Sequence, residues 1–417
     1  MKQLIIEGGK QLTGEIKISG AKNSVVGLIP AAILSDEEVT LYNVPKISDT
    51  IALIDIIEEL NGVVDYKNET MKIDTSKIEN KIIDESYSKR LRASYYFMGA
   101  LLAKFKHAEI YFPGGCNIGA RPIDLHISGF KKMGVDVTTE GDKYILHAEK
   151  LKGARIYLDF ASVGATINLM VAATKAEGTT YISNAAKEPE IVNIASLLNN
   201  MGAKITGAGT SEIKIVGVKK LGKAVIDVIP DRIEAGTYII TGALVGKDLK
   251  ISGIIEEHVE SLLSKLKEMG ADFKVEDNSI IISKAKKYKP INVKTLVYPG
   301  FPTDLGQPIT VLLTQAEGVS IFEETIYENR MGHIKYLQKL GADIKVNDRT
   351  AIVNGATELV GQEVVATDLR AGAAMVIGGL IATGKTVIND IEHILRGYEN
   401  IVEKLTKVGA TIEIVEL

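Results

Sequence analysis

The sequence lacks the features that would favour a secreted, membrane or nucleic-acid-binding protein. It has one cysteine in 417 residues, so no internal disulfide can form and nothing indicates an oxidising compartment. The net charge of −4 gives no reason to expect a nucleic acid or an anionic membrane as partner. The N-terminal segment has no apolar signal-peptide stretch, and the longest apolar runs fall short of the roughly 20 residues that span a membrane. A cytoplasmic protein is therefore expected.

Metal and nucleotide-binding signatures are also scarce. The six histidines are scattered, and there is neither an H-E-x-x-H motif nor a cysteine pair, so no metal site is predicted. Residues 379–386, "GLIATGKT", match the P-loop pattern. A P-loop follows a strand and opens a helix, whereas here a helical segment precedes the match and a strand-like run follows it. We interpret the match as a turn and not as a site for ATP.

The sequence does contain an internal repeat of about 70 residues. At six places a helix-like segment ends in a large apolar residue followed by glycine, and a strand-like run comes next. The glycines are Gly62, Gly134, Gly202, Gly270, Gly341 and Gly409, with spacings of 72, 68, 68, 71 and 68 residues. Glycine at this place suits a left-handed helix C-cap. Six near-even spacings predict six repeats.

A second helical segment in the repeats predicts the fold. It is made of small and aliphatic residues, as in 235–251 and 370–388, and is apolar nearly all round, so we expect it to be buried inside the amphipathic helices. Two helices and three or four short strands per repeat indicate helices inside and sheets outside. The chain is too long for one core, so we expect two α/β domains of three repeats, divided near Pro230. A cleft between them is the natural place for a site.

The single thiol, Cys116, lies in the glycine-rich and proline-bounded segment "PGGCNIGARP". A lone cysteine is more often buried and inert than reactive. Here little apolar bulk surrounds the sulfur, and loops of this kind often carry function. The nearby Arg121 would lower the pKa of the thiol. The residues alone leave an inert and a functional thiol both open.

Cationic residues recur at the repeat junctions, several beside glycines and just before apolar helices. They are Lys22, Arg92, Arg121, Arg330, Arg370 and Arg396. Each alone could be a surface charge, but together with helix N-termini they would attract a small, highly anionic substrate. Asp231, Asp304 and Asp368 are candidate bases, and a turn or N-cap role is the alternative for each.

Several motifs together carry a resemblance to a known family. They are "SGAKNS", "PGGCNIGARPIDLH", "SVGATINLM", "NAAKEPEIV", "PDRIEAGT", "FPTDLGQ", "YENRMGH", "TDLRAGAA" and "RGYENI". From about residue 3 to the C-terminus the chain resembles the enolpyruvyl transferases that act on UDP-N-acetylglucosamine, the UDP-N-acetylglucosamine 1-carboxyvinyltransferases. The resemblance implies two inside-out α/β-prism domains, one formed by residues 1–21 with 230–417 and the other by 22–229. The active site would lie in the interdomain cleft.

The resemblance also implies an activity. The enolpyruvyl group of phosphoenolpyruvate would pass to the 3′-hydroxyl of UDP-N-acetylglucosamine through a tetrahedral ketal, with release of phosphate. This is the first committed step of peptidoglycan precursor synthesis, and so serves cell shape and division. The implied enzyme is a cytoplasmic monomer without metal or cofactor, and its two small-molecule substrates are its only partners. The resemblance does not distinguish between the two isozyme types that some bacteria carry.

Site residues follow from the same resemblance. Cys116 would be a general acid toward phosphoenolpyruvate and the target of fosfomycin, Asp304 would accept the hydroxyl proton, and Asp368 would help at the reacting carbon. Phosphoenolpyruvate would bind to Lys22, Arg92, Arg121, Arg330, Arg370 and Arg396, of which Lys22 and Arg396 also count as catalytic. The nucleotide sugar would bind to Asn23, Arg92, Arg121, Pro122, Ile123, Asp124, Leu125, Ser162, Val163, Glu188, Asp304 and Ile326.

Three alternatives stay open. A transferase of this fold could use another hydroxyl acceptor, which the intact "SVGAT" and "ARPIDLH" segments disfavour. An RNA 3′-phosphate cyclase is disfavoured by the net charge and by the failed P-loop. A non-catalytic repeat scaffold, or a regulatory paralogue that binds ligand without turnover, is disfavoured by the complete set Lys22, Cys116, Asp304 and Arg396, because a pure scaffold has no reason to hold all four. Gly306 and Pro308 depart from the usual family pattern, so the backbone behind Asp304 is expected to differ.

Overall fold

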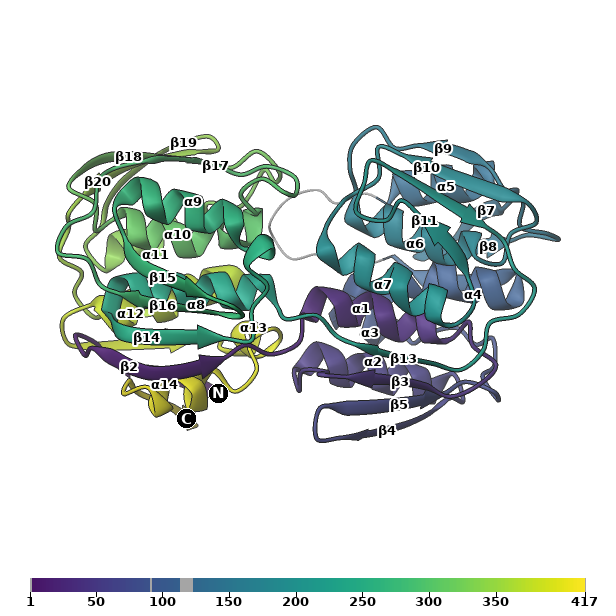
Figure 1. Cartoon of the computed structure of the whole chain (residues 1–417), viewed down its shortest axis with the longest axis horizontal. Helices are drawn as coiled ribbons and strands as arrows, with labels where there is room; N and C mark the ends of the chain where they lie inside the picture. The colour runs from purple at the N-terminus through teal and green to yellow at the C-terminus, as the bar shows by residue number, and fades with distance from the viewer. Residues whose placement is uncertain (1, 91, 113–122, 417) are drawn as a thin grey trace. The chain divides into compact units, whose positions relative to one another are not determined.

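The computed structural model describes residues 2–90, 92–112 and 123–416, and these residues form two units with three β-sheets each (Figure 1). The C-terminal unit combines Met1–Ser19 with Pro230–Leu417, and the N-terminal unit lies within residues 20–229. No helix among the described residues combines the length and the hydropathy that a membrane span requires.

In the N-terminal unit, short sheets enclose apolar helices. The strand orders are β13–β3–β5–β4, β6–β8–β7 and β11–β12–β10–β9. The strands are β3 (Val39–Tyr42), β4 (Val63–Lys67), β5 (Thr70–Asp74), β6 (His107–Tyr111), β7 (Asp136–Glu140), β8 (Lys143–His147), β9 (Arg155–Tyr157), β10 (Thr179–Ser183), β11 (Lys204–Thr206), β12 (Glu212–Val216) and β13 (Ala224–Asp227). The inner helices are α1 (Lys22–Ala32), α4 (Phe97–Phe105) and α6 (Val163–Ala173). The amphipathic helices are α2 (Ser48–Glu59), α5 (Asp124–Lys132) and α7 (Pro189–Asn200), and α3 (Glu85–Arg90) and η1 (Arg92–Tyr96) lead into α4.

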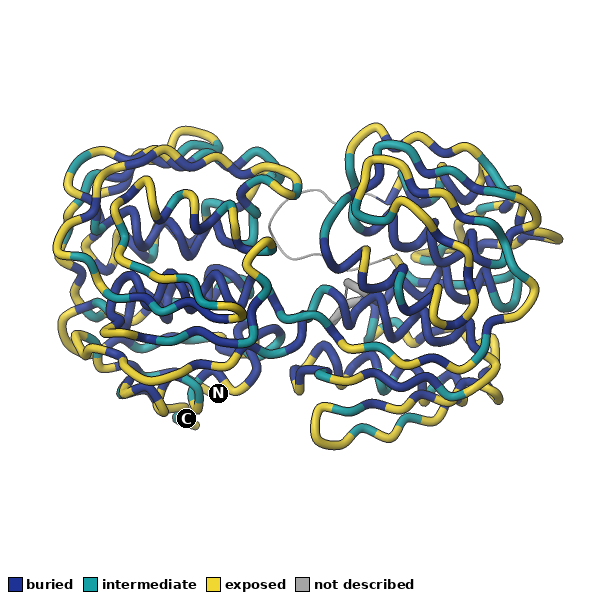
Figure 2. Tube along the Cα trace, viewed as in Figure 1, coloured by how far each residue is buried: buried dark blue, intermediate teal, exposed yellow. Residues whose placement is uncertain are grey.

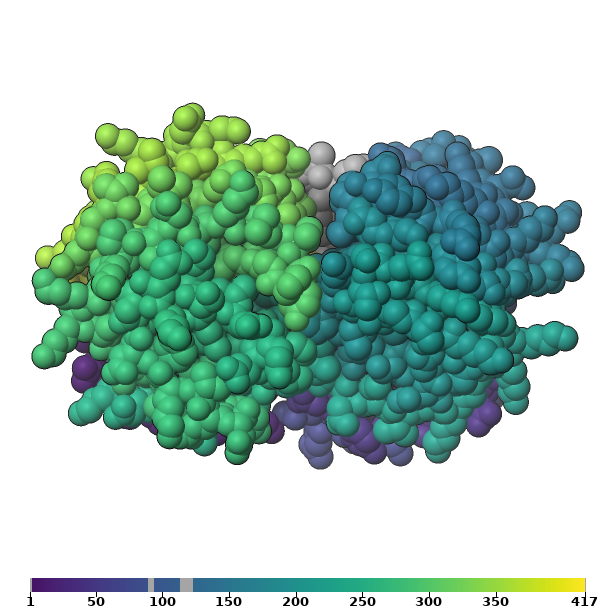
Figure 3. Space-filling model, turned by 45° about the horizontal axis from the view of Figure 1, so that its top comes forward, coloured from purple at the N-terminus to yellow at the C-terminus, as the bar shows by residue number. Residues whose placement is uncertain are grey.

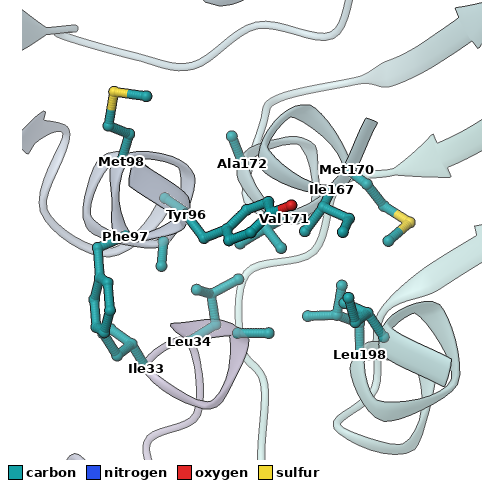
Figure 4. Close-up of a cluster of buried hydrophobic side chains, with 14 of the residues drawn as sticks. Ile33, Leu34, Tyr96, Phe97, Met98, Ile167, Met170, Val171, Ala172 and Leu198 are labelled. Atoms are coloured by element: carbon teal, nitrogen blue, oxygen red, sulfur yellow. The ribbon is translucent and has the colours of Figure 1, made fainter. Parts of the chain in front are cut away.

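The inner helices form the core because they are apolar on every side. In α6 every residue from Gly164 to Ala173 is buried. Where α4 meets α6, a Cβ atom on Gly99 would lie 2.4 Å from the carbonyl oxygen of Asn168, so a glycine is needed for this approach. The Gly99 N–H donates to Oδ1 of Asn168 at 2.9 Å. Figure 4 shows part of this core, with side chains of α4 and α6 among Ile33, Leu34 and Leu198.

The C-terminal unit repeats this plan. Its strand orders are β15–β16–β14–β2, β17–β18–β20–β19 and β21–β22–β1–β23. The strands are β1 (Lys2–Glu7), β2 (Leu12–Lys17), β14 (Gly246–Ser252), β15 (Asp272–Glu276), β16 (Ser279–Ser283), β17 (Asn292–Lys294), β18 (Gly318–Glu323), β19 (Asp343–Asn347), β20 (Thr350–Gly355), β21 (Glu363–Val365), β22 (Lys385–Asn389) and β23 (Thr411–Glu416). The inner helices are α8 (Arg232–Val245), α10 (Gly306–Leu313) and α12 (Leu369–Ile381), and the outer ones are α9 (Glu260–Met269), α11 (Ile334–Lys339) and α14 (Ile401–Lys407). Three short helices complete the unit: η2 (Glu256–His258), η3 (Thr303–Leu305) and α13 (Glu392–Leu395).

Burial follows this layering. The inner helices are buried along their length, and the sheets alternate between buried and exposed residues (Figure 2). The sheet of β17–β20 lies along the edge that comes forward in Figure 3, and its solvent face exposes some apolar side chains, such as Val319 and Ile321. This is the predicted arrangement of helices inside and sheets outside.

The N-terminal strands belong to the C-terminal unit. β1 pairs antiparallel with both β22 and β23, and so takes the central position that β16 and β20 take in the neighbouring sheets. β2 pairs parallel with β14 and opens the fourth repeat, as β17 and β21 open the fifth and sixth. The start of the chain therefore completes two repeats of the C-terminal unit, the fourth and the sixth.

The repeat glycines close their helices as expected, with one exception. Five of them have φ between 83° and 109°, in the left-handed region. In the first repeat Asn61 takes this conformation instead, with φ 71°, and Gly62 follows it. A Cβ atom on Gly62 would lie 2.6 Å from Cγ2 of Ile57, so Gly62 is needed for space. Asparagine is the residue that most readily replaces glycine at such a position, and the prediction for Gly62 was wrong in this respect.

The P-loop-like segment is a turn, as interpreted from the sequence. Helix α12 ends at Ile381, Gly384 has φ 86°, and β22 begins at Lys385. The order is helix, turn and strand, which is the reverse of a phosphate-binding loop.

Candidate functional site

A carboxylate held by two arginines is the centre of the candidate site in the C-terminal unit. Asp304 lies in η3, directly before α10. Its Oδ1 accepts from Nη2 of Arg330 at 2.6 Å, and its Oδ2 accepts from Nη2 of Arg370 at 3.0 Å. The arginine side chains are 5% and 4% exposed, and that of Asp304 is 27% exposed. The structure therefore brings together three residues that the sequence nominated separately.

The electrostatics of this group favour charge on every member. Burial alone would raise the pKa of Asp304, but the guanidinium groups of Arg370 and Arg330 outweigh it and hold that pKa well below its usual range. Burial would likewise lower the pKa of Arg370, and the Asp304 carboxylate raises it instead. Asp304 is thus in its base form, but it is a weak proton acceptor while both ion pairs persist.

Helix geometry fixes Arg370, and it also gives Asp368 a structural role. Asp368 is the N-cap of α12, and its Oδ1 accepts from the backbone N–H groups of Arg370 at 2.8 Å and Ala371 at 3.0 Å. Such a cap stabilises the start of a helix. Asp231 caps α8 in the same way. The N-cap role that the sequence left open for these two aspartates is what the structure shows, and a catalytic role for Asp368 stays a prediction.

In the N-terminal unit the nominated residues gather at the starts of helices. Lys22 begins α1, and its Nζ lies 3.0 Å from Oδ2 of the buried Asp49. Ser162 caps α6, and its Oγ accepts from the N–H of Ala165 at 3.3 Å. The others in this group are Asn23, which follows Lys22, Val163 at the start of α6, Ile123, Asp124 and Leu125 at the start of α5, and Glu188 at the N-cap of α7. Backbone N–H groups at helix starts favour anions.

Comparison with known proteins places this geometry in a family. The sequence-family model described as EPSP synthase (3-phosphoshikimate 1-carboxyvinyltransferase) matches residues 6–405. The chain belongs to the EPSP synthase family. The family indicated by the motifs is thereby confirmed.

Two kinds of relative support this assignment. UDP-N-acetylglucosamine 1-carboxyvinyltransferase 2 of Listeria monocytogenes serovar 1/2a is 52% identical over 410 residues, which cover 98% of this chain and 97% of the relative. The protein of the same name from Bacillus subtilis strain 168 is 52% identical over 413 residues, with 99% and 96% covered. The crystal structure of the enolpyruvyl transferase NikO from Streptomyces tendae has a TM-score of 0.91, with 26% identity over 99% of both chains.

The predicted fold of two α/β units is confirmed by these structural neighbours. EPSP synthase from Acinetobacter baumannii matches over the whole of both chains with a TM-score of 0.78 and 18% identity, and so supports the fold alone.

Some nominated family residues cannot be placed. Cys116, Arg121 and Pro122 lie outside the described residues, and of Arg92 only the backbone, at the start of η1, is described. Arg396 follows α13 and is half-buried, and Ile326 lies half-buried in the segment after β18. Within the described ranges, no group of three or more His, Cys, Asp or Glu side chains could hold a metal ion.

Sequence reasoning missed the side chains that support the arginines. Thr303 accepts from Nη1 of Arg330 at 2.7 Å, and Tyr398 accepts from Nη1 of Arg370 at 3.2 Å. Glu324, which is buried, accepts from the hydroxyl of Thr303 at 2.7 Å. The adjacency of Thr303 to Asp304 was one available signal. Glu324 gave no signal, because the sequence alone does not distinguish a buried glutamate in an acidic stretch from a solvent-exposed one.

Proposed function

We propose that the protein transfers the enolpyruvyl group of phosphoenolpyruvate to the 3′-hydroxyl of UDP-N-acetylglucosamine and releases phosphate. The observation that carries this proposal is the pair of hydrogen bonds that hold Asp304 between Arg330 and Arg370 at the start of two inner helices. A base next to fixed cations is what the addition of a hydroxyl to an anionic enol phosphate requires. The acceptor follows from the relatives that are 52% identical over nearly the whole chain.

Residues of this chain fill the roles of the addition step and hold the leaving phosphate; the ketal then loses a proton from C3 together with phosphate, which gives the enol ether product. Cys116 delivers a proton to C3 of phosphoenolpyruvate while the sugar hydroxyl, losing its proton to Asp304, attacks C2. Arg330 and Arg370 bind the substrate carboxylate. The phosphate is bound by Lys22, Arg92, Arg121 and Arg396, which also stabilise its charge as it leaves the tetrahedral ketal. Asp368, whose side chain caps α12, would help at the reacting carbon.

The nucleotide sugar is bound mainly by residues of the N-terminal unit. Helix starts there present backbone N–H groups, and these suit the diphosphate. The set is Asn23, Arg92, Arg121, Pro122, Ile123, Asp124, Leu125, Ser162, Val163 and Glu188, with Asp304 and Ile326 from the C-terminal unit.

The ion pairs of Asp304 provide a way for the pKa of its carboxyl group to rise only when substrate binds. While both guanidinium groups face Asp304, the pKa of its carboxyl group is too low for efficient proton transfer. A substrate carboxylate competes for the same guanidinium groups and weakens their hold on Asp304. The pKa of Asp304 then rises, so the base gains strength when phosphoenolpyruvate is bound.

The cellular setting follows from this reaction. We place the protein in the cytoplasm as a monomer, at the first committed step of peptidoglycan precursor synthesis, and hence in cell shape and division. Its two units would be a catalytic domain, residues 1–21 with 230–417, and a domain of residues 22–229 that carries the Cys116 segment. A fosfomycin-type epoxide would inhibit it by alkylating that thiol.

Acceptor choice tests this proposal. Purified protein is incubated with phosphoenolpyruvate and either UDP-N-acetylglucosamine or shikimate 3-phosphate, and the products are identified by mass spectrometry. We expect an enolpyruvyl adduct of the nucleotide sugar only. Adduct formation on shikimate 3-phosphate alone would reassign the substrate and leave the family assignment intact.

A further inference from the structure

Glu324 has a buried carboxylate that accepts four hydrogen bonds from the segments around Asp304. It directly follows β18 and is 2% exposed. Its Oε1 accepts from the Thr295 hydroxyl at 2.9 Å and from the backbone N–H groups of Ile326 at 2.7 Å and Tyr327 at 3.2 Å. Its Oε2 accepts from the Thr303 hydroxyl at 2.7 Å. A side chain that is costly to bury has therefore been placed where four donors converge.

The first route from Glu324 to the site runs through one hydroxyl group. Thr303 has a single hydroxyl proton, and it points to Glu324. The oxygen lone pairs of Thr303 are then directed elsewhere, and one of them accepts from Nη1 of Arg330 at 2.7 Å. The other end of that guanidinium, Nη2, donates to Asp304. Glu324 thereby sets the donor-to-acceptor direction of a series of hydrogen bonds that ends at the proposed base, Asp304.

The second route runs through the backbone. By accepting from the N–H groups of Ile326 and Tyr327, Glu324 fixes the turn that follows β18. The ring of Tyr327 lies 5.2 Å from the Arg330 guanidinium carbon, within the range of a cation–π contact. Two independent contacts of Arg330 thus depend on the same carboxylate.

We propose that Glu324 is a positioning residue for enolpyruvyl transfer, which fixes the Arg330 guanidinium against Asp304 through the Thr303 hydroxyl and the Tyr327 segment. It touches neither substrate nor reacting atoms and acts only through these neighbours. The proposal rests on the roles given to Asp304 and Arg330 in the proposed function.

Substitutions at Thr303 test the hydroxyl route without removing a charge. Thr303→Val keeps the shape of the side chain but removes the hydroxyl, whereas Thr303→Ser keeps it. Loss of a charge-assisted hydrogen bond should lower kcat of Thr303→Val on the order of tenfold or more. Thr303→Ser should stay within about threefold of the wild type, because the same bonds can form. The KM for UDP-N-acetylglucosamine should change less than about twofold in both, since the contact to Ile326 is unaltered.

Glu324→Gln tests the carboxylate itself. Its amide group would donate toward Thr303, so the hydroxyl of Thr303 could no longer give its proton to position 324. We expect a fall in kcat similar to that of Thr303→Val. If the two residues act through the same series of hydrogen bonds, the double variant Thr303→Val/Glu324→Gln should have a kcat no lower than that of the slower single variant.

The neighbouring residue provides a matched control. Glu323 ends β18 and pairs with Lys294 at 3.1 Å, and both side chains are exposed. Glu323→Gln makes the same chemical change on the other side of the strand and should leave kcat and KM unchanged. Circular dichroism and thermal unfolding of all variants establish that they are folded.

The outcomes separate this proposal from the proposed function. The role of Glu324 would be overturned by a wild-type kcat in Thr303→Val. It would also be overturned if the fold-loss of kcat in the double variant equalled the product of the fold-losses in the two single variants. If Glu324→Gln does not fold, the contrast between the Thr303 variants still decides. An inactive Asp304→Asn beside fully active Glu324→Gln and Thr303→Val would overturn only the positioning role. An active Asp304→Asn would overturn the role of the base and the positioning role together.

Discussion

Replacing Asp304 by asparagine should destabilise the protein and make that stability depend on anions. The carboxylate accepts from two guanidinium groups, at 2.6 and 3.0 Å, whose side chains are 5% and 4% exposed. Asp304→Asn keeps the size of the side chain and removes the charge. Two like charges then remain buried near each other without the group that compensates them.

The size of the effect follows from burial. Removing one partner of a buried ion pair costs about 3–5 kcal/mol. Because the Asp304 side chain is 27% exposed, water screens part of its charge, and we expect the lower end, about 3 kcal/mol. For a domain of this size that corresponds to a fall in Tm of roughly 6–12 °C. The measurement is thermal unfolding near pH 7.5, with Glu323→Gln as a control for a carboxylate lost from the surface.

Anions should then recover the lost stability. The proposed binding of phosphoenolpyruvate to Arg330 and Arg370 meets no competing carboxylate in the variant, so the same concentration should raise the Tm of Asp304→Asn by more than that of the wild type. An unchanged Tm in the variant, or equal shifts with phosphoenolpyruvate, would refute the competition between Asp304 and the substrate for these arginines.

Three further predictions concern the titration of His333 and the thiol of Cys116. Burial lowers the pKa of His333 to about 3, so its contribution to stability is present above its ordinary pKa near 6.5 and is lost as the pH falls toward about 3, at up to ~1.4 kcal/mol per pH unit. His333→Gln should flatten the fall in unfolding free energy between about pH 6 and 4, measured with urea; slopes equal to the wild type would contradict this. A fosfomycin-type epoxide should add once to the protein at Cys116, and intact-mass analysis without an adduct would rule this out. Cys116→Asp should resist the epoxide and keep some turnover, because the proposed role is proton transfer.

The repeat architecture could be predicted because it depends on patterns of apolar residues and glycines within short stretches of the sequence. Helices such as α6 and α12 are apolar on every side, and only a core can accommodate them. Five of the six repeat glycines mark helix ends because few other residues accept a left-handed conformation. Asn61 shows the limit of this rule, since an asparagine took the conformation that was assigned to Gly62.

The candidate site could be predicted only in part. The motifs nominated Asp304, Arg330 and Arg370. Along the chain, Arg330 lies 26 residues after Asp304 and Arg370 lies 66 residues after it. Only tertiary structure shows that one carboxylate bridges both arginines, and hence that its pKa is lowered. For Asp368, the sequence could not separate an N-cap from a base, because both roles suit an aspartate before an apolar helix.

The supporting residues escaped prediction for a physical reason. A buried glutamate such as Glu324 is stable only because four donors from three segments meet it. Its own neighbourhood along the chain supplies only the backbone N–H groups of Ile326 and Tyr327, and gives no sign of the two threonine hydroxyls that come from other segments. The strand β1 poses the same problem, since its partners β22 and β23 lie near the other end of the sequence.

Phosphate release from phosphoenolpyruvate, by the wild type and by Asp304→Asn, tests the central claim most directly. We expect release only when UDP-N-acetylglucosamine is also present, and a fall of at least about 100-fold in a folded Asp304→Asn variant that still binds the nucleotide sugar. Release without the nucleotide sugar, or at the wild-type rate in Asp304→Asn, would contradict the assignment of Asp304 as the base of an enolpyruvyl transfer.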